Sequence, residues 1–239
     1  MNNSFYPSIV DSFLKTPDKI REYALTLDYN PSSTLSFPGT RSKDLESFNP
    51  QFKKDFITKV LKIYCPEETA NSATHNKSLV YFQKHHLYSE DKHKAENKGW
   101  IHQDHDLFNS IAGVVYLTPD ADLECGTSLY RAKNKRVTVK DWNRGEFETQ
   151  KYNLLRFNKL DKDKYRKAHK DWQGRFEETV RINNVYNRLI VYSSTEYHSI
   201  NKYQVSDKER LTIVFFIQGI KGIPIPKLKL SSDNLDEYI

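Results

Sequence analysis

The feature that most constrains the fold is a series of short segments rich in β-branched and aromatic residues, most of them bounded by Gly, Pro, Asn or Asp. They occupy residues 78–84, 110–118, 127–131, 177–183, 188–193 and 210–217. This composition and these boundaries are typical of β-strands. Because no regular helical pattern separates each pair, the series favours an antiparallel sandwich or barrel over a parallel βαβ sheet.

The first part of the chain has a helical pattern instead. Thr16-Pro17-Asp18 is typical of a helix start, with a capping residue, a proline and an acid in the first turn. Asn49-Pro50 repeats the signal before apolar residues at helical spacing, which predicts a helix over 50–64. Between the two helices, residues 37–42 are predicted to form a turn-rich loop.

We expect a single domain over residues 1–239, a length that permits one substantial core. Residues 1–77 would provide helical support, 78–218 the β core and 219–239 a tail. Residues 132–175 are charged and Lys-rich, with a helical stretch at 162–172. We interpret them as an insertion between strands, since no Gly/Ser/Pro-rich linker marks a second domain.

The sequence predicts a soluble, cytoplasmic protein. The N-terminus lacks a basic segment followed by an apolar one, and the apolar runs are too short to cross a bilayer. Cys65 and Cys125 are too few for a disulfide framework. Lys-, Asn- and Tyr-rich usage hints at an AT-rich genome, and a viral source would make the compartment the host cytoplasm. The sequence leaves the oligomeric state open.

Net charge does not decide the partner. The formal charge is +6, but 37 Lys and Arg stand against 31 Asp and Glu, and the two signs are interleaved. A mixed, solvated surface explains this pattern, although nucleic acid is not excluded.

The residues that indicate chemistry are Trp100-Ile101-His102-Gln103-Asp104. Alternate residues of a strand face the same way, so His102 and Asp104 would share one face. An imidazole and a carboxylate, joined by a distant histidine, form the facial triad that binds Fe(II) and leaves positions open. The motif alone is weak, and His169-Lys170-Asp171 repeats it. That copy lies in the helix-like insertion, where residues i and i+2 do not face each other.

The order of later residues strengthens the first motif. A buried strand and a turn with Gly126 follow it, then His198 in Tyr197-His198-Ser199, and Arg210 opens a final apolar strand. This order resembles the 2-oxoglutarate/Fe(II)-dependent oxygenase superfamily over residues 78–218. Within it, the chain is similar to the prolyl-hydroxylase-like branch and to small uncharacterised bacterial and phage oxygenases. The resemblance implies a mainly β fold with flanking helices around a double-stranded β-helix (jelly-roll, cupin-like) core.

The resemblance also implies site roles. His102, Asp104 and His198 match the iron ligands, and Arg210 matches the residue that holds the far carboxylate of 2-oxoglutarate. A guanidinium suits that task because it binds a carboxylate bidentately and stays charged. Tyr116 and Thr212 are expected to assist at the same carboxylate. The alternatives are core packing for Tyr116, a surface salt bridge for Arg210 and a structural role for His198.

The implied function is a dioxygenase that uses Fe(II), 2-oxoglutarate and O2, with hydroxylation as the default outcome. The primary substrate stays open between a peptide side chain, an amino acid, a nucleobase and a small metabolite. Arg41 in the 37–42 loop, Trp100, Arg131 and the 132–175 insertion are candidates for the substrate rim. Cys125 replaces a glycine common in relatives and is expected near the pocket.

Two other functions remain in view. One is a cupin-like metal protein without 2-oxoglutarate chemistry, and the other is a non-catalytic basic binding module. A rival histidine cluster is also conceivable, but strand neighbours face opposite ways, and we interpret its members as loop histidines: His85, His86, His93 and His105.

Overall fold

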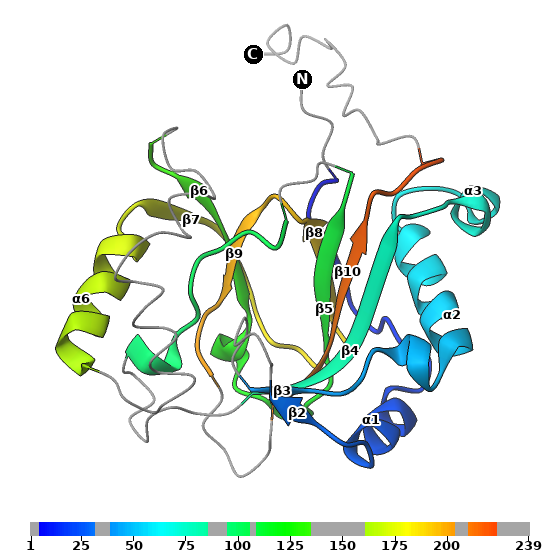
Figure 1. Ribbon diagram of the computed structural model, residues 1–239, viewed down its shortest axis with the longest axis horizontal. Coiled ribbons are helices and arrows are strands. Elements are labelled where there is room, and N and C mark those ends of the chain that lie inside the picture. Colours follow the sequence, from blue (N-terminus) through cyan, green and yellow to red (C-terminus); the bar gives the residue numbers. More distant parts are fainter. Residues whose placement is uncertain are drawn as a thin grey trace, which may run out of the picture.

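Two antiparallel sheets face each other in the computed structural model, which describes residues 5–31, 39–85, 95–105, 109–134, 161–203 and 210–223 (Figure 1). The larger sheet has the order β1 (Ser8–Val10), β8 (Leu189–Ser193), β5 (Ile111–Tyr116), β10 (Arg210–Gln218), β4 (Lys77–His85), β3 (Thr40–Arg41), β2 (Asn30–Pro31). The smaller sheet has the order β7 (Phe176–Ile182), β6 (Thr127–Ala132), β9 (Tyr197–Ile200). The predicted jelly-roll class is confirmed, and each of the six predicted strands lies within two residues of its expected bounds.

Alternation along the strands divides the core into two layers. On β10, Leu211, Ile213 and Phe215 belong to the cluster that packs under the N-terminal helices. The residues between them, Thr212 among them, face the space between the sheets. A second apolar cluster lines that space, with members from both sheets: Ala112, Tyr116, Leu129, Ile182, Ile190 and Tyr192. Strand periodicity thus explains why one face of β10 is wholly apolar and the other carries polar groups.

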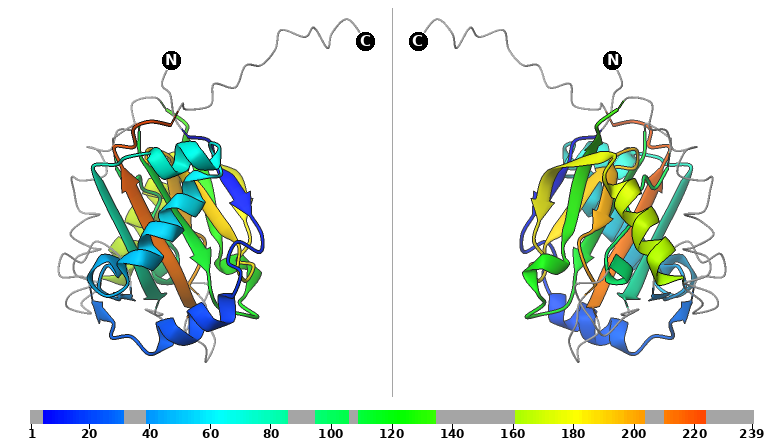
Figure 2. Two further views of the ribbon diagram at one scale, coloured as in Figure 1. Left: turned by 90° about the vertical axis from the view of Figure 1, so that its right-hand side faces the viewer. Right: turned by 90° about the vertical axis from the view of Figure 1, so that its left-hand side faces the viewer.

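The N-terminal helices are α1 (Pro17–Leu25), α2 (Pro50–Leu61) and α3 (Glu67–Ser72), and α2 and α3 cover the outer face of the larger sheet (Figures 1 and 2). The Phe56 ring of α2 packs edge-on against Phe215 of β10 at 5.3 Å. Asn49 caps α2 as expected, since its side chain accepts a hydrogen bond from the Phe52 amide at 3.2 Å. Thr16 is likewise the N-cap residue of α1, with Pro17 at the helix start and Asp18 in the first turn as predicted, although its side chain makes no capping hydrogen bond.

The first 77 residues are not only helical. β1 joins the larger sheet beside β8, and Arg41, expected in a loop, lies in β3 and pairs with Gln83 of β4. The first two residues of the predicted 37–42 loop, 37 and 38, lie outside the described residues. The described residues also include three short 3-10 helices: η1 (Leu45–Ser47), η2 (Ala95–Asn97) and η3 (Leu123–Cys125).

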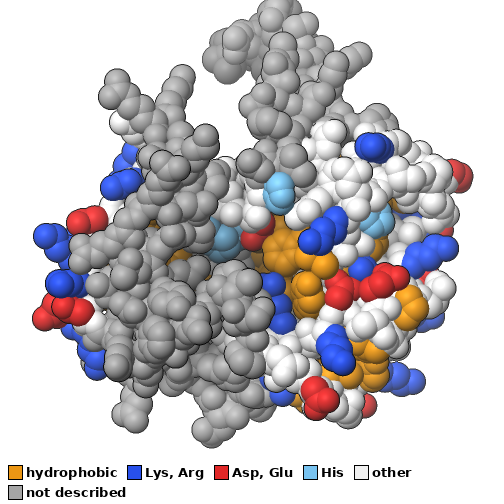
Figure 3. All heavy atoms as spheres, in the orientation of Figure 1, with side chains coloured by type: hydrophobic (Ala, Val, Ile, Leu, Met, Phe, Trp, Pro, Cys, Tyr) orange, Lys and Arg blue, Asp and Glu red, His pale blue; other side chains and the backbone are white. Residues whose placement is uncertain are grey.

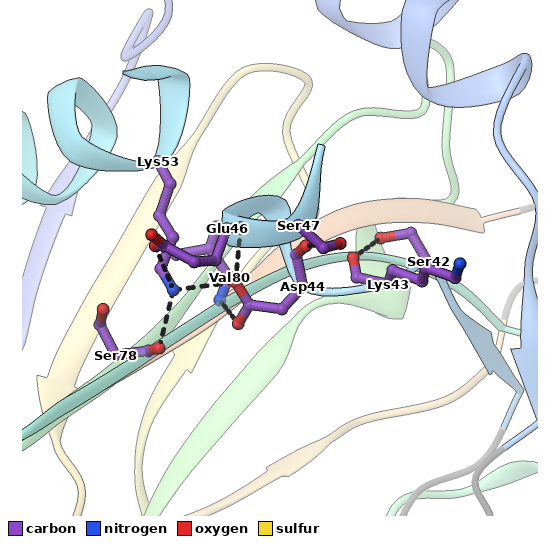
Figure 4. Close-up of polar contacts among 8 residues, drawn as sticks. All are labelled: Ser42, Lys43, Asp44, Glu46, Ser47, Lys53, Ser78 and Val80. Atoms are coloured by element: carbon purple, nitrogen blue, oxygen red, sulfur yellow. Dashed lines mark hydrogen bonds and ion pairs between the residues drawn. The ribbon is translucent and has the colours of Figure 1, made fainter. Parts of the chain in front are cut away.

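A buried ion pair joins α2 to the sheet (Figure 4). The Lys53 ammonium lies 2.8 Å from the Asp44 carboxylate and donates to the Ser78 carbonyl at 2.9 Å. Asp44 also accepts from the amides of Glu46 and Val80. The carboxylate therefore holds η1, α2 and β4 together.

The helix α6 (Lys162–Gln173), predicted as a helical stretch over residues 162–172, lies outside the smaller sheet (Figure 1). Its Trp172 indole donates to the Ile101 carbonyl at 2.8 Å, and Tyr165 packs edge-on against Trp100 at 5.0 Å. The helix thereby supports the segment that carries His102. The rest of the expected insertion, 135–160, and most of the tail, 224–239, lie outside the described residues. No described helix is long and apolar enough to cross a membrane.

Candidate functional site

His102, Asp104 and His198 converge between the sheets. Their ligand atoms all lie within 4.8 Å of one another. Asp104 is 3.5 Å from His102 Nε2 through Oδ1 and 3.3 Å from His198 Nε2 through Oδ2. His198 lies in β9, whereas His102 makes an isolated bridge to it and Asp104 follows in a bend. The Asp104 amide donates to the Ser194 carbonyl at 3.0 Å, which holds the bend against the end of β8.

Backbone carbonyls orient both imidazoles. His102 Nδ1 lies 2.8 Å from the Trp100 carbonyl, and His198 Nδ1 lies 3.0 Å from the Glu196 carbonyl. A carbonyl oxygen can only accept, so Nδ1 carries the proton in each ring and donates it. In the neutral form of each ring the lone pair is therefore on Nε2, the atom that faces Asp104. This is the outer-shell arrangement found around metal-binding histidines.

The electrostatics of the cluster suit a cation. Burial lowers the pKa of His198 to about 4, against the opposing attraction of Asp104, so this imidazole is neutral at pH 7. Burial alone would raise the pKa of Asp104, but the nearby His198, His102 and Arg41 outweigh it and hold that pKa below its ordinary value. Two imidazole nitrogens and one carboxylate form a nitrogen and oxygen donor set that fits a divalent first-row metal.

Arg210 lies at the other sheet, with only 3% of its surface exposed. Its Nε donates to the Cys125 carbonyl at 3.1 Å, an Nη contacts His85 Nδ1 at 2.9 Å, and the guanidinium lies over the Tyr116 ring at 5.4 Å. No carboxylate among the described residues pairs with it. A buried guanidinium paired only with neutral groups is costly, and burial lowers its pKa accordingly. The arrangement leaves the positive charge to be neutralised by a ligand.

Tyr116 and Thr212 lie beside Arg210 in different ways. Thr212 is fully buried, lines the cavity and follows Arg210 on the same face of β10. The Tyr116 hydroxyl instead donates to Thr127 Oγ1 at 2.9 Å, and its ring supports the guanidinium. Thr127, which the sequence analysis missed, occupies the cavity wall in front of Tyr116.

The three candidate substrate residues have different positions. Arg41 lines the cavity from β3, and its Nε donates to Gln83 Oε1 at 2.7 Å. Trp100 also lines the cavity, and its ring packs edge-on against Tyr165 and His169 of α6. Arg131 is exposed and pairs with Glu177 across β6 and β7 at 2.8 Å, outside the cavity. Arg131 does not line the cavity, since it follows the last pairing of β6 with β9, at Tyr130.

The cavity, about 350 Å³, is lined from both sheets and has the size of a small-molecule site. It joins the cluster of His102, Asp104 and His198 to Arg210. Sequence reasoning missed several of its lining residues, including Gln83, Tyr192 and Tyr203, and it interpreted His85 as a loop histidine. His85 in fact ends β4 and contacts Arg210. Strand alternation could have identified Gln83 and His85 as cavity-facing, because Tyr81, Gln83 and His85 alternate with the buried Val80 and Phe82.

The rival metal sites receive no support among the described residues, where the His102, Asp104 and His198 group is the one cluster of this kind. His169 is buried in α6, with Nε2 at 3.2 Å from the Gly99 carbonyl. Its partner in the repeated motif, Asp171, lies on the same helix, as expected from the sequence. His86 and His93 lie outside the described residues.

On the face shown in Figure 3, histidine, acidic and apolar side chains meet near the centre, and Lys and Arg are interspersed with Asp and Glu toward the margins. This distribution agrees with the mixed surface expected from the sequence. It gives no observation in favour of a basic binding module.

Solved structures share the fold at low sequence identity. The epimerase SnoN of nogalamycin biosynthesis, described as alpha-ketoglutarate dependent, aligns with a TM-score of 0.52 and 13% identity over 89% of this chain and 78% of its own. HygX from Streptomyces hygroscopicus with iron bound aligns with a TM-score of 0.50 and 12% identity over 90% and 83%. A Pseudomonas putida prolyl-4-hydroxylase aligns with a TM-score of 0.45 and 13% identity over 90% and 93%. The expected fold likeness to 2-oxoglutarate oxygenases is confirmed.

A search of curated proteins finds no match to the chain. One family model matches, and it covers residues 6–217, which span both sheets and all the site residues named above. The chain therefore belongs to the family of unknown function DUF6445.

Proposed function

We propose that this protein is an Fe(II)- and 2-oxoglutarate-dependent dioxygenase that hydroxylates its primary substrate. The observation that supports it is the pairing, within one cavity, of a His-Asp-His donor set and a buried guanidinium that no described carboxylate neutralises. The relatives in fold agree with this proposal, since SnoN is described with Fe3+ and alpha ketoglutarate and HygX with iron.

The two sheets would contribute different parts of the site. His102, Asp104 and His198 would hold Fe(II) from the side of the smaller sheet, which leaves the positions facing the cavity for ligands. Arg210 would bind the far carboxylate of 2-oxoglutarate bidentately, with Thr212 beside it. Tyr116 and Thr127 would hold the guanidinium and the cavity wall in place. Bound iron would supply oxygen activation, which the side chains cannot.

The overall reaction balances as 2-oxoglutarate, O2 and a substrate C–H giving succinate, CO2 and a substrate C–OH. The protein contributes orientation and the exclusion of water. Val214, Phe216 and Tyr192 provide apolar wall around the reacting region. Because an apolar wall excludes water, the oxidation would be directed at the bound substrate.

The test is an anaerobic titration of 2-oxoglutarate into the Fe(II)-loaded protein, following the metal-to-ligand charge-transfer absorbance. We expect a saturable band, followed by succinate formation when O2 is admitted. Metal binding without the band would favour the cupin-like alternative. Absence of metal binding would leave a non-catalytic binding module.

A further inference from the structure

Tyr192 carries a hydroxyl group that the fold leaves without a hydrogen bond. The residue is 4% exposed and lines the cavity from β8. Among the residues that the structure describes, none donates to or accepts from this hydroxyl. Tyr64 shows the usual arrangement, since its hydroxyl donates to the Tyr6 carbonyl at 3.1 Å. Because a buried hydroxyl without a partner is costly, the exception at Tyr192 indicates that a ligand in the cavity supplies one.

The Tyr192 ring lies against the cluster of His102, Asp104 and His198. Its centroid is 4.5 Å from that of the His198 ring, and the two planes are tilted by 42°. Two residues further along the chain, the Ser194 carbonyl accepts from the Asp104 amide at 3.0 Å. Tyr192 therefore lies beside two of the three candidate ligands, and it belongs to the apolar cluster between the sheets. Its hydroxyl is confined to the end of the cavity at which a metal would bind.

Arg210 lies in a different row of the larger sheet. Tyr192 pairs with Ala112 of β5, which pairs with Phe216 of β10. Phe216 follows Arg210 by six residues on β10, and an even spacing places both side chains on the same face of the strand. Tyr192 and Arg210 thus line one cavity from separate rows. A ligand that contacts both would extend from the cluster toward Arg210.

The chemistry of the cluster determines what the hydroxyl would meet. A set of two imidazoles and one carboxylate leaves positions of the metal open for oxygen ligands. If Arg210 binds the far carboxylate of 2-oxoglutarate, the oxo-carboxylate end of the molecule is directed toward the cluster. Its oxygen atoms can accept hydrogen bonds, and a phenol carries its proton at neutral pH. Tyr192 is the residue whose free donor lies at this end.

We propose that the Tyr192 hydroxyl donates a hydrogen bond to the oxo-carboxylate end of 2-oxoglutarate and so orients the co-substrate at the cluster. This inference rests on the proposed function, because it assumes that iron occupies the cluster and that 2-oxoglutarate extends from it to Arg210. It adds a binding residue at the end of the co-substrate opposite Arg210. A hydrogen bond to an ionised oxygen is stronger than one between neutral groups, which would offset the cost of an unpaired hydroxyl.

The experiment removes the hydroxyl and keeps the ring, in the variant Tyr192→Phe. Its affinity for Ni(II), measured by calorimetry, should equal that of the wild type, since no ligand is lost. In the Fe(II)-loaded protein under anaerobic conditions, affinity for 2-oxoglutarate should fall about tenfold or more. The charge-transfer band at saturation should move to shorter wavelength. The reason is that a hydrogen bond donated to the oxo-carboxylate lowers the energy of the orbital that accepts the electron.

Two other variants provide the comparison. Arg210→Gln acts at the far carboxylate, so it should weaken 2-oxoglutarate binding and leave the position of the saturated band unchanged. Tyr64→Phe removes an equivalent hydroxyl on the outer side of the larger sheet and should change neither the affinity nor the band. In the metal-free protein Tyr64→Phe should lower the unfolding temperature, because a hydrogen bond is lost. Tyr192→Phe should not lower it, because none is lost.

The outcomes separate this inference from the proposed function. Wild-type affinity for 2-oxoglutarate in Tyr192→Phe would overturn the inference, and so would a weaker affinity with an unmoved band. A fall in Ni(II) affinity would also overturn it, by showing that the hydroxyl acts on a metal ligand such as Asp104. If the Fe(II)-loaded wild type gave no charge-transfer band with 2-oxoglutarate, the proposed function itself would be contradicted, and this inference with it.

Discussion

His102 and His198 pair as an isolated antiparallel bridge, in which each amide donates to the other's carbonyl at 2.9 Å. The bridge places the two imidazole rings 4.3 Å apart, centroid to centroid. Because residues far apart in the chain are joined here by backbone bonds, the spacing of the two rings does not depend on a bound ion. The donor set is in this sense organised before binding, which lowers the cost of ordering it.

Replacing His198 with Ala should remove one of three ligands while leaving the bridge, which is made by backbone atoms. We expect Ni(II) or Co(II) affinity to fall by more than about 100-fold, since even outer-shell changes cost about 10–100-fold. Calorimetric metal titration measures the effect, and circular dichroism checks the fold. His75→Ala, outside the cluster, is the control and should bind metal normally. Wild-type affinity in His198→Ala would remove His198 from the ligand set.

Replacing Arg210 with Gln should weaken 2-oxoglutarate binding without changing metal affinity. A charge-assisted pair worth about 3–4 kcal/mol corresponds to a loss on the order of 10²–10³ in affinity. The measurement is the anaerobic charge-transfer titration, with Arg131→Gln as the variant of equal charge. If Arg210→Gln bound 2-oxoglutarate as tightly as the wild type, the co-substrate carboxylate would have to lie elsewhere.

The strands and the shared orientation of His102 and Asp104 could be predicted because both depend on local patterns, whereas His198 was assigned through the resemblance to 2-oxoglutarate oxygenases. In β4, β5 and β10 alternate residues face opposite sides of the sheet, so the strands can be recognised from their alternation. His102 and Asp104 are two residues apart, so in an extended segment their side chains lie on the same face. The prediction worked although Asp104 lies in a bend, because the bridge at His102 keeps that segment extended.

The cavity wall depends on pairings between distant segments, which local patterns do not contain. Arg41 and Gln83 meet because β3 adds to the edge of β4, and β3 is only two residues long. The position of Arg131 outside the cavity is another example, because it follows the last pairing of β6 with β9. The pairing of β6 with β7 also shifts between Leu129 and Tyr130. A bulge of this kind cannot be read from alternation alone.

Replacing Lys53 with Met should destabilise the fold without affecting metal binding. It removes the buried partner of Asp44 and the donor to the Ser78 carbonyl. Breaking a buried pair costs about 3–5 kcal/mol, and the partial exposure of Asp44 places the expected loss near about 3 kcal/mol. Urea denaturation measures it. Lys54→Met, at the exposed neighbouring position of α2, is the control and should change stability by less than about 0.5 kcal/mol. Equal stabilities of the two variants would show that the pair is not needed to join α2 to the sheet.

Cys125 should resist alkylation in the folded protein, although its carbonyl contacts Arg210 next to the cavity. The residue is fully buried, and burial raises the pKa of its thiol to about 11. The thiolate is the reactive form, so at pH 8 only about one molecule in 10³ is reactive. Raising the pH by one unit should increase the fraction about tenfold, until the pKa is approached. Iodoacetamide labelling with peptide mass spectrometry measures both cysteines, and Cys65, which is partly exposed, provides the internal comparison. In urea, where the protein is unfolded, Cys65 and Cys125 should be alkylated at similar rates. Fast labelling of Cys125 at pH 8 without urea would show that the wall behind Arg210 opens to solvent, and that the guanidinium is less buried than its 3% exposure indicates.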